Sequence, residues 1–200
     1  MMISLPDRRR LIGLSLLAAA VNLLPSGAAE GAAGQDAPPK RPPAGQPPRD
    51  FDFLFGSWRV RHRRLKERLA GCTEWEEFDG TCTCRPLLGG GGNVDDNVLE
   101  LPEGTYRGVG LRSFDAETKT WAIWWLDSRR PHVLDVPVIG SFADGVGTFE
   151  ADDTLRGQPI RMRFTWSRVT PRSAHWEQAF SPDGGKAWET NWRMEFTRTA

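Results

Sequence analysis

The chain has 200 residues, with 26 basic and 26 acidic side chains and a formal net charge of zero. This length fits one domain, and the even charge balance disfavours a nucleic-acid partner, which needs a concentrated basic face. Three histidines and three cysteines show no zinc-ligand spacing, so neither a metal nor a cofactor is expected. A local basic run at 59–68 is interpreted as the solvated face of a strand.

The first 29 residues have the order of a bacterial export signal. Three arginines at 8–10 precede an apolar run at 11–24, which small residues follow. This run is short for a bilayer core of about 30 Å, so we expect cleavage near Ala28 or Ala29 rather than stable membrane insertion. The mature protein is then periplasmic or secreted. The adjacent arginines leave twin-arginine export open beside the ordinary secretory route.

Residues 30–50 differ in composition from everything that follows. They include six prolines and no large apolar side chain, so they cannot build a core. We expect a disordered, Pro-rich linker here. The folded domain is then 51–200, which is long enough for one hydrophobic core.

The folded domain shows strand periodicity. Short runs rich in Trp, Phe, Val, Thr and Arg alternate with turn clusters, and within the run 158–169 the apolar residues recur at every second position. The expected strands are 57–67, 73–85, 94–101, 105–114, 119–127, 132–141, 145–153, 158–169, 173–181 and 186–198. An open sheet of ten strands would leave edges exposed, so an all-β, up-and-down antiparallel barrel is predicted. Such a barrel can hold a small ligand or be filled by side chains.

The start of this domain, "FDFLFGSWRV" at 51–60, resembles the Gly-x-Trp signature of lipocalins and of the wider calycin superfamily. The runs 106–128 and 181–198 are similar to a bacterial family of exported lipocalin-like proteins. The resemblance implies a helical turn that closes one barrel end, with Trp58 packed beneath an arginine of the last strand. Arg193 and Arg198 are both candidates for that arginine.

A second motif, "SPDGGKAW" at 181–188, resembles the Asp box of sialidases. A propeller would repeat this motif with its blades, and the chain has one full match. We therefore interpret it as a hairpin. Asp183 should accept hydrogen bonds from turn amides, Gly185 should supply a permissive backbone, and Trp188 should fold over the turn.

Nine tryptophans indicate an aromatic core that can also line a cavity. Strand parity places eight candidate ligand-binding residues on inward faces: His62, Tyr106, Arg112, Trp125, Asp127, Trp176, Gln178 and Trp192. Because a buried charge needs a partner, Arg112 is expected to pair with Asp127. Some calycin proteins bind haem through a histidine of a late strand, but the last strand here has none, so haem is not expected.

The cysteines leave two alternatives open. Cys82 and Cys84 lie two residues apart, on one face of a strand, and are poorly placed to pair with each other. Either could pair with Cys72 across a hairpin, or all three could be small buried thiols.

The leading hypothesis is an exported protein that binds a small apolar or amphipathic ligand inside the barrel. One alternative is an isomerase or hydrolase that uses the same cavity on a lipophilic substrate. Another is a non-catalytic envelope protein with a filled barrel. No catalytic residues are assigned, because neither a nucleophile elbow nor an acid/base pair of carboxylates is recognisable.

Overall fold

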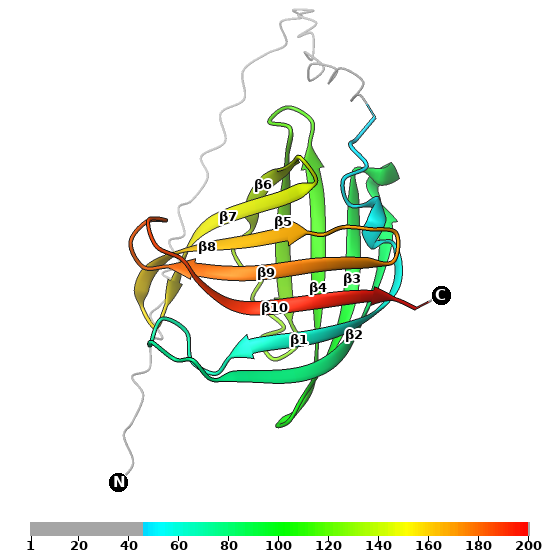
Figure 1. Ribbon diagram of the computed structural model, residues 1–200. Helices are drawn as coiled ribbons and strands as arrows, with labels where there is room; N and C mark the ends of the chain where they lie inside the picture. The colour runs from blue at the N-terminus through cyan, green and yellow to red at the C-terminus, as the bar shows by residue number, and fades with distance from the viewer. Residues whose placement is uncertain (1–45, 200) are drawn as a thin grey trace, which may run out of the picture. The chain divides into compact units, whose positions relative to one another are not determined.

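The structure, a computed structural model, describes residues 46–199. The expected export signal and most of the expected linker lie outside the described residues. The described chain forms a closed antiparallel barrel in which each strand pairs with the next and β1 pairs with β10 (Figure 1). The predicted fold class is thereby confirmed. None of the described residues forms a helix that could span a membrane.

The ten strands are β1 (Gly56–Leu65), β2 (Trp75–Leu87), β3 (Gly92–Leu101), β4 (Gly104–Asp115), β5 (Thr120–Asp127), β6 (Val138–Ala143), β7 (Val146–Leu155), β8 (Gln158–Ser167), β9 (Ser173–Ser181) and β10 (Glu189–Arg198). Two short 3-10 turns, η1 (Asp52–Leu54) and η2 (Leu88–Gly90), complete the described elements.

The sixth strand differs most from its expected range, 132–141. It starts only at Val138, and the residues before it form a connection that touches β5 through a single bridge, Leu126 to Leu134. Pro131 and Pro137 explain the late start, because proline has no N–H to donate to a sheet. As a result, β5 and β6 pair over three residues only.

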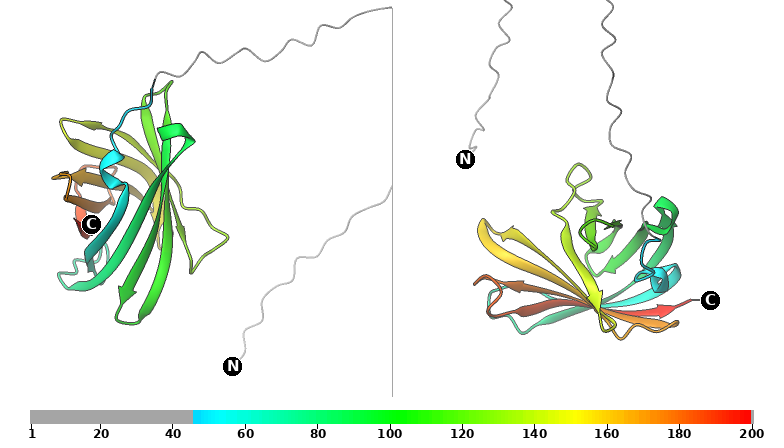
Figure 2. Two further views of the ribbon diagram at one scale, coloured as in Figure 1. Left: turned by 90° about the vertical axis from the view of Figure 1, so that its right-hand side faces the viewer. Right: turned by 90° about the horizontal axis from the view of Figure 1, so that it is seen from above.

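One barrel end is closed by η1, which lies where β1 begins and β10 ends (Figure 2). An aromatic cluster packs there. The ring of Phe51 meets the rings of Trp121 and Phe142 edge-on, with centroids 5.0 and 5.1 Å apart. Phe51 and Leu54 are fully buried. Burial of such side chains, at about 25 cal/mol per Å² of apolar area, fixes this end of the barrel.

Arg198, and not Arg193, lies over Trp58. Its guanidinium carbon is 4.2 Å from the Trp58 ring centroid, and its two terminal nitrogens donate to the carbonyls of Phe55 and Phe53 at 2.6 Å. The Trp58 Nε1–H donates to the Leu54 carbonyl at 2.7 Å. Arg193 instead lies on the outer face, 2.8 Å from Glu177. First and last strands thus hold the closing turn together.

The 181–188 segment is the hairpin connection between β9 and β10. Asp183 Oδ1 accepts hydrogen bonds from the amides of Lys186 and Ala187 and from the Ser181 hydroxyl, at 2.7 to 3.0 Å. These bonds lower the pKa of Asp183. Gly185 has a φ of +96°, and Trp188 Nε1 donates to its carbonyl at 2.9 Å. Every contact expected of this turn is present.

All three cysteines are free. Cys82 and Cys84 are buried on the inward face of β2, whereas Cys72 lies in the β1–β2 connection and is partly exposed. The structure therefore has no disulfide between Cys72 and either Cys82 or Cys84. Of the three buried thiols that the other alternative expected, two are buried and Cys72 is partly exposed.

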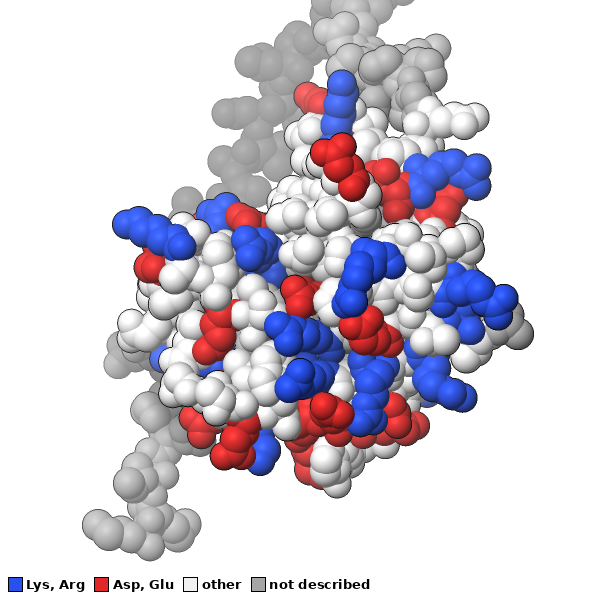
Figure 3. Space-filling view, viewed as in Figure 1, with Lys and Arg blue, Asp and Glu red and all other residues white. Residues whose placement is uncertain are grey.

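The outer surface carries mixed charge. Over β1, β9 and β10, positive and negative side chains alternate (Figure 3), and ion pairs join them, such as Arg61 with Glu77 and Arg168 with Glu195. The basic run at 59–68 is thus only in part a solvated face. Arg59, Arg61 and Arg63 point outward, but Arg64 lines the barrel interior.

Candidate ligand-binding cavity

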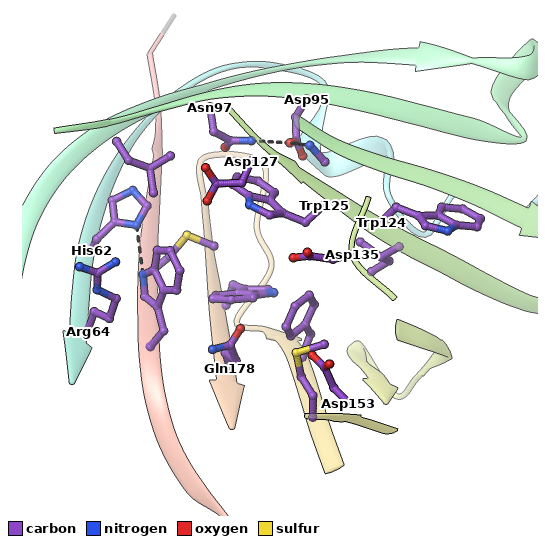
Figure 4. A pocket seen from close by; sticks show the side chains of 18 of the residues that line it. His62, Arg64, Asp95, Asn97, Trp124, Trp125, Asp127, Asp135, Asp153 and Gln178 are labelled. Atoms are coloured by element: carbon purple, nitrogen blue, oxygen red, sulfur yellow. Dashed lines mark hydrogen bonds between the residues drawn. The ribbon is translucent and has the colours of Figure 1, made fainter. Parts of the chain in front are cut away.

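The barrel interior contains a cavity of about 440 Å³, and Figure 4 shows some of the side chains that line it. This volume is in the range of small-molecule sites, about 300 to 1,000 Å³. All eight candidate ligand-binding residues line it. Strand parity therefore identified inward side chains correctly, and whether they contact a ligand stays a prediction.

Indole and phenyl rings form one wall of the cavity. Trp176 on β9 meets Phe164 edge-on at 4.9 Å and Trp192 on β10 edge-on at 6.0 Å between centroids. Such contacts favour fixed ring orientations. Across the barrel, Trp125 lies over Gly108, where an added Cβ would be 2.0 Å from the indole. The space that this glycine leaves is filled by the ring.

His62 is held in this wall as a neutral ring. It stacks on Phe78 at 4.6 Å with planes 9° apart, and its Nδ1 accepts a hydrogen bond from Trp192 Nε1 at 3.3 Å. Burial, with a smaller contribution from the positive charge of Arg64, lowers the pKa of His62 to about 3. Because Nδ1 is the acceptor, the ring proton is on Nε2.

Gln178 contributes a neutral amide side chain to this wall of the cavity. It is buried, and its Nε2 donates to Asn191 Oδ1 at 2.8 Å. The register of β9 and β10 shifts between Thr190 and Trp192, which places Asn191 inside the barrel with no exposed surface. A register shift of this kind is not visible in the alternation pattern of the sequence.

The floor of the cavity contains a buried ion pair that differs from the predicted one. Arg112 Nη1 donates to Asp95 Oδ2 at 2.5 Å and to Asn93 Oδ1 at 2.9 Å. The expected pairing with Asp127 was wrong, because Arg112 pairs in register with Ile123 of β5 and Asp127 with Gly108. Four strand positions, about 13 Å, separate the two levels.

Asp127 lies at the mouth, opposite the floor. Its carboxylate accepts from Arg129 Nη2 at 2.6 Å, from Arg129 Nε at 3.0 Å and from the Arg129 amide at 2.8 Å. The side-chain hydrogen bond from Arg129 lowers the pKa of Asp127. The Arg129 guanidinium in turn lies 3.7 Å from the ring centroid of Tyr106, whose pKa burial raises. Tyr106 and Asp127 thus belong to the rim.

Among the further charged residues that line the cavity, and that the strand pattern did not identify, are Arg64, Arg68, Asp95, Arg129, Asp135 and Asp153. Three of them, Arg68, Arg129 and Asp135, lie in connections, where no alternation indicates direction. Arg64 shares strand parity with His62, so that signal could have identified it. Among residues 46–199, no cluster of His, Cys, Asp or Glu could hold a metal ion.

No protein-family model and no curated protein matches this sequence. The fold and the cavity define a calycin-like barrel. The chain is similar in structure to the S-type phycobiliprotein lyase CPES from Guillardia theta, with a TM-score of 0.51 and 11% identity over 75% of this chain and 90% of that one. At this identity the likeness shows the fold alone. The expected bacterial family of exported proteins stays a prediction.

Proposed function

We propose that this protein binds a small, partly apolar ligand inside the barrel. The observation that carries the proposal is the cavity of about 440 Å³, lined by ordered indoles and by a few buried polar groups. An interior built only for stability would be filled at the density of other protein cores, with few voids larger than a water molecule. The cavity therefore disfavours the filled-barrel alternative.

The enzyme alternative has one observation in its favour, because a strongly perturbed histidine is a common feature of active sites. A general base works best with a pKa near the working pH, and the pKa of His62 is about 3. The lone pair at Nδ1 is also already engaged by Trp192. His62 thus orients a cavity wall, and binding without chemistry is the better supported function.

We further propose that the protein works in the periplasm or outside the cell, after export by either route. The order of basic, apolar and small residues at 1–29 supports this, followed by the Pro-rich segment 30–50. The mass of the mature protein from a periplasmic extract tests it. Cleavage near Ala28 or Ala29 is expected, and an intact N-terminus in the cytoplasmic fraction would contradict export.

Binding is tested by native mass spectrometry and by titration with N-phenyl-1-naphthylamine, a neutral apolar dye. Met194 lines the cavity, so Met194→Trp should fill it and weaken dye binding at least about tenfold. Thr197→Trp, on the exposed face of the same strand, is the matched control and should bind as the wild type does. A wild-type protein that carries no ligand and binds no dye would refute the proposed function.

A further inference from the structure

Arg68 is a cation without an acidic partner in the part of the chain that the structure describes. It lies in the β1–β2 connection, partly buried, and lines the cavity. Among the residues that the structure describes, no carboxylate forms an ion pair with Arg68, and its Nε is buried with no hydrogen-bond acceptor. Partial removal of a guanidinium from water costs free energy unless a negatively charged group binds it.

The charges around Arg68 make this environment more positive. Burial lowers the pKa of Arg68, and Arg64 and Arg129 lower it further. Arg64 is held by Glu76 at 2.7 Å and lies 5.5 Å from the Trp192 ring centroid. Arg129 is held by Asp127 at 2.6 Å. Each of these two guanidiniums is therefore fixed by a carboxylate, whereas Arg68 has no ion pair with any residue of the range 46–199.

Arg68 differs in this respect from the other cations that line the cavity. The other lining cations each have a carboxylate, in the pairs Arg64–Glu76, Lys66–Glu74, Arg112–Asp95, Arg129–Asp127 and Arg130–Asp135. The lining carboxylate without an ion pair among the described residues is Asp153, on β7. Figure 4 shows Asp135 and Asp153 on the side of the cavity opposite Arg64. Arg64 and Asp153 thus lie on opposite sides of the cavity.

We propose that the ligand is an amphipathic anion, whose carboxylate or phosphate binds Arg68, near Arg64 and Arg129, while its apolar body lies against Trp176 and Trp192. The inference rests on the proposed function. The planar guanidinium offers two parallel N–H donors to such an oxyacid, and partial burial strengthens the attraction. The anion gives Arg68 the counter-charge that no carboxylate among the described residues supplies to it in an ion pair.

A pair of dyes with one arylamine body tests the inference. N-phenyl-1-naphthylamine is neutral, and 1-anilinonaphthalene-8-sulfonate adds one negative charge. Wild-type protein should bind the anionic dye at least about tenfold more tightly, or about 1.4 kcal/mol. Raising the salt from about 0.01 M to about 0.5 M should reduce this preference, because screening weakens interactions between charges that are not fully buried.

Arg68→Gln should remove the preference for the anionic dye and leave the affinity for the neutral dye within about twofold. Arg68→Lys should restore part of the preference, because it restores the charge without the planar pair of donors. Arg59→Gln is the matched control, since Arg59 is exposed on the outer face of β1. The near-ultraviolet circular dichroism of the tryptophans checks that each variant is folded.

Competitors with one chain length identify the acid. Displacement of the dye by dodecanoate or dodecyl phosphate supports the proposal if dodecanol, which has no charge, competes more weakly than both. The stronger of the two anions then shows whether the site prefers a carboxylate or a phosphate. Equal affinity for the two dyes, or an equal loss of both in Arg68→Gln, overturns the anionic ligand and leaves the proposed function intact. Failure of the wild type to bind either dye refutes the proposed function itself.

Discussion

Arg112 and Asp95 form an ion pair at 2.5 Å inside the barrel, where each side chain keeps less than a tenth of its surface exposed. The next residue of β3, Asp96, pairs with Arg107 of β4 on the outer face. Strands β3 and β4 thus carry one Arg–Asp ion pair in the barrel interior and a second one on the outer surface. This arrangement allows the energetic effect of burial to be measured within one protein.

Removing one member of the inner pair should be strongly destabilising. Asp95→Asn leaves Arg112 buried without its counter-charge, which costs about 3 to 5 kcal/mol of the free energy of unfolding. Asp96→Asn, the outer control, should cost at most about 1 kcal/mol. Urea unfolding followed by tryptophan fluorescence measures both. Similar losses in the two variants would contradict a special role for the inner pair.

Arg198 should stabilise the barrel far more than Arg193 does. Arg198→Gln removes two hydrogen bonds to the carbonyls of the closing turn and the contact with Trp58, about 2 to 4 kcal/mol in total. Arg193→Gln removes a partly exposed ion pair with Glu177 and should cost at most about 1 kcal/mol. Thermal unfolding of the two variants compares them, and the reverse ranking would be inconsistent with this structure.

His62 should make stability depend on pH in the acid range. Its pKa is about 3 in the folded protein, below the unfolded value of about 6.5, so the unfolded state binds the proton first. Stability is therefore complete above about pH 6.5 and is lost as the pH falls toward 3, by up to about 1.4 kcal/mol per pH unit.

The variant His62→Gln should flatten this part of the pH profile, measured by urea unfolding between about pH 7 and pH 4. His132→Gln, at an exposed position in the β5–β6 connection, is the control and should keep the wild-type slope. A profile with an unchanged slope in His62→Gln would show that other groups cause the acid sensitivity.

One of the three thiols should react in the folded protein. Cys72 is partly exposed, whereas burial raises the pKa of Cys82 and raises that of Cys84 to about 12, so neither buried thiol forms the reactive thiolate. Mass spectrometry after treatment with iodoacetamide should show one added group without denaturant and three with it. Two or three groups on the folded protein would mean that the β2 face opens.

The strand pattern identified the barrel and its interior but not the connections. Nine of the ten strands start within three residues of their expected positions, and all eight candidate cavity residues point inward. The late start of β6 was missed, because Val133, Leu134 and Val136 are residue types common in strands, whereas Pro131 and Pro137 cannot donate a hydrogen bond to a sheet. Arg68 and Arg129 were missed as lining residues, because loops have no periodicity from which direction can be inferred.

The sequence by itself determined which side chains share the barrel interior, because alternation along a strand is a local property of the backbone. Only the tertiary structure decided which of them meet. The register between β3, β4 and β5 places Arg112 beside Asp95, with which it forms an ion pair, and away from Asp127. The path of the β1–β2 connection brings Arg68 to the cavity without an ion-pair partner among the described residues. Both outcomes depend on contacts between distant segments, which a pattern along one strand cannot encode.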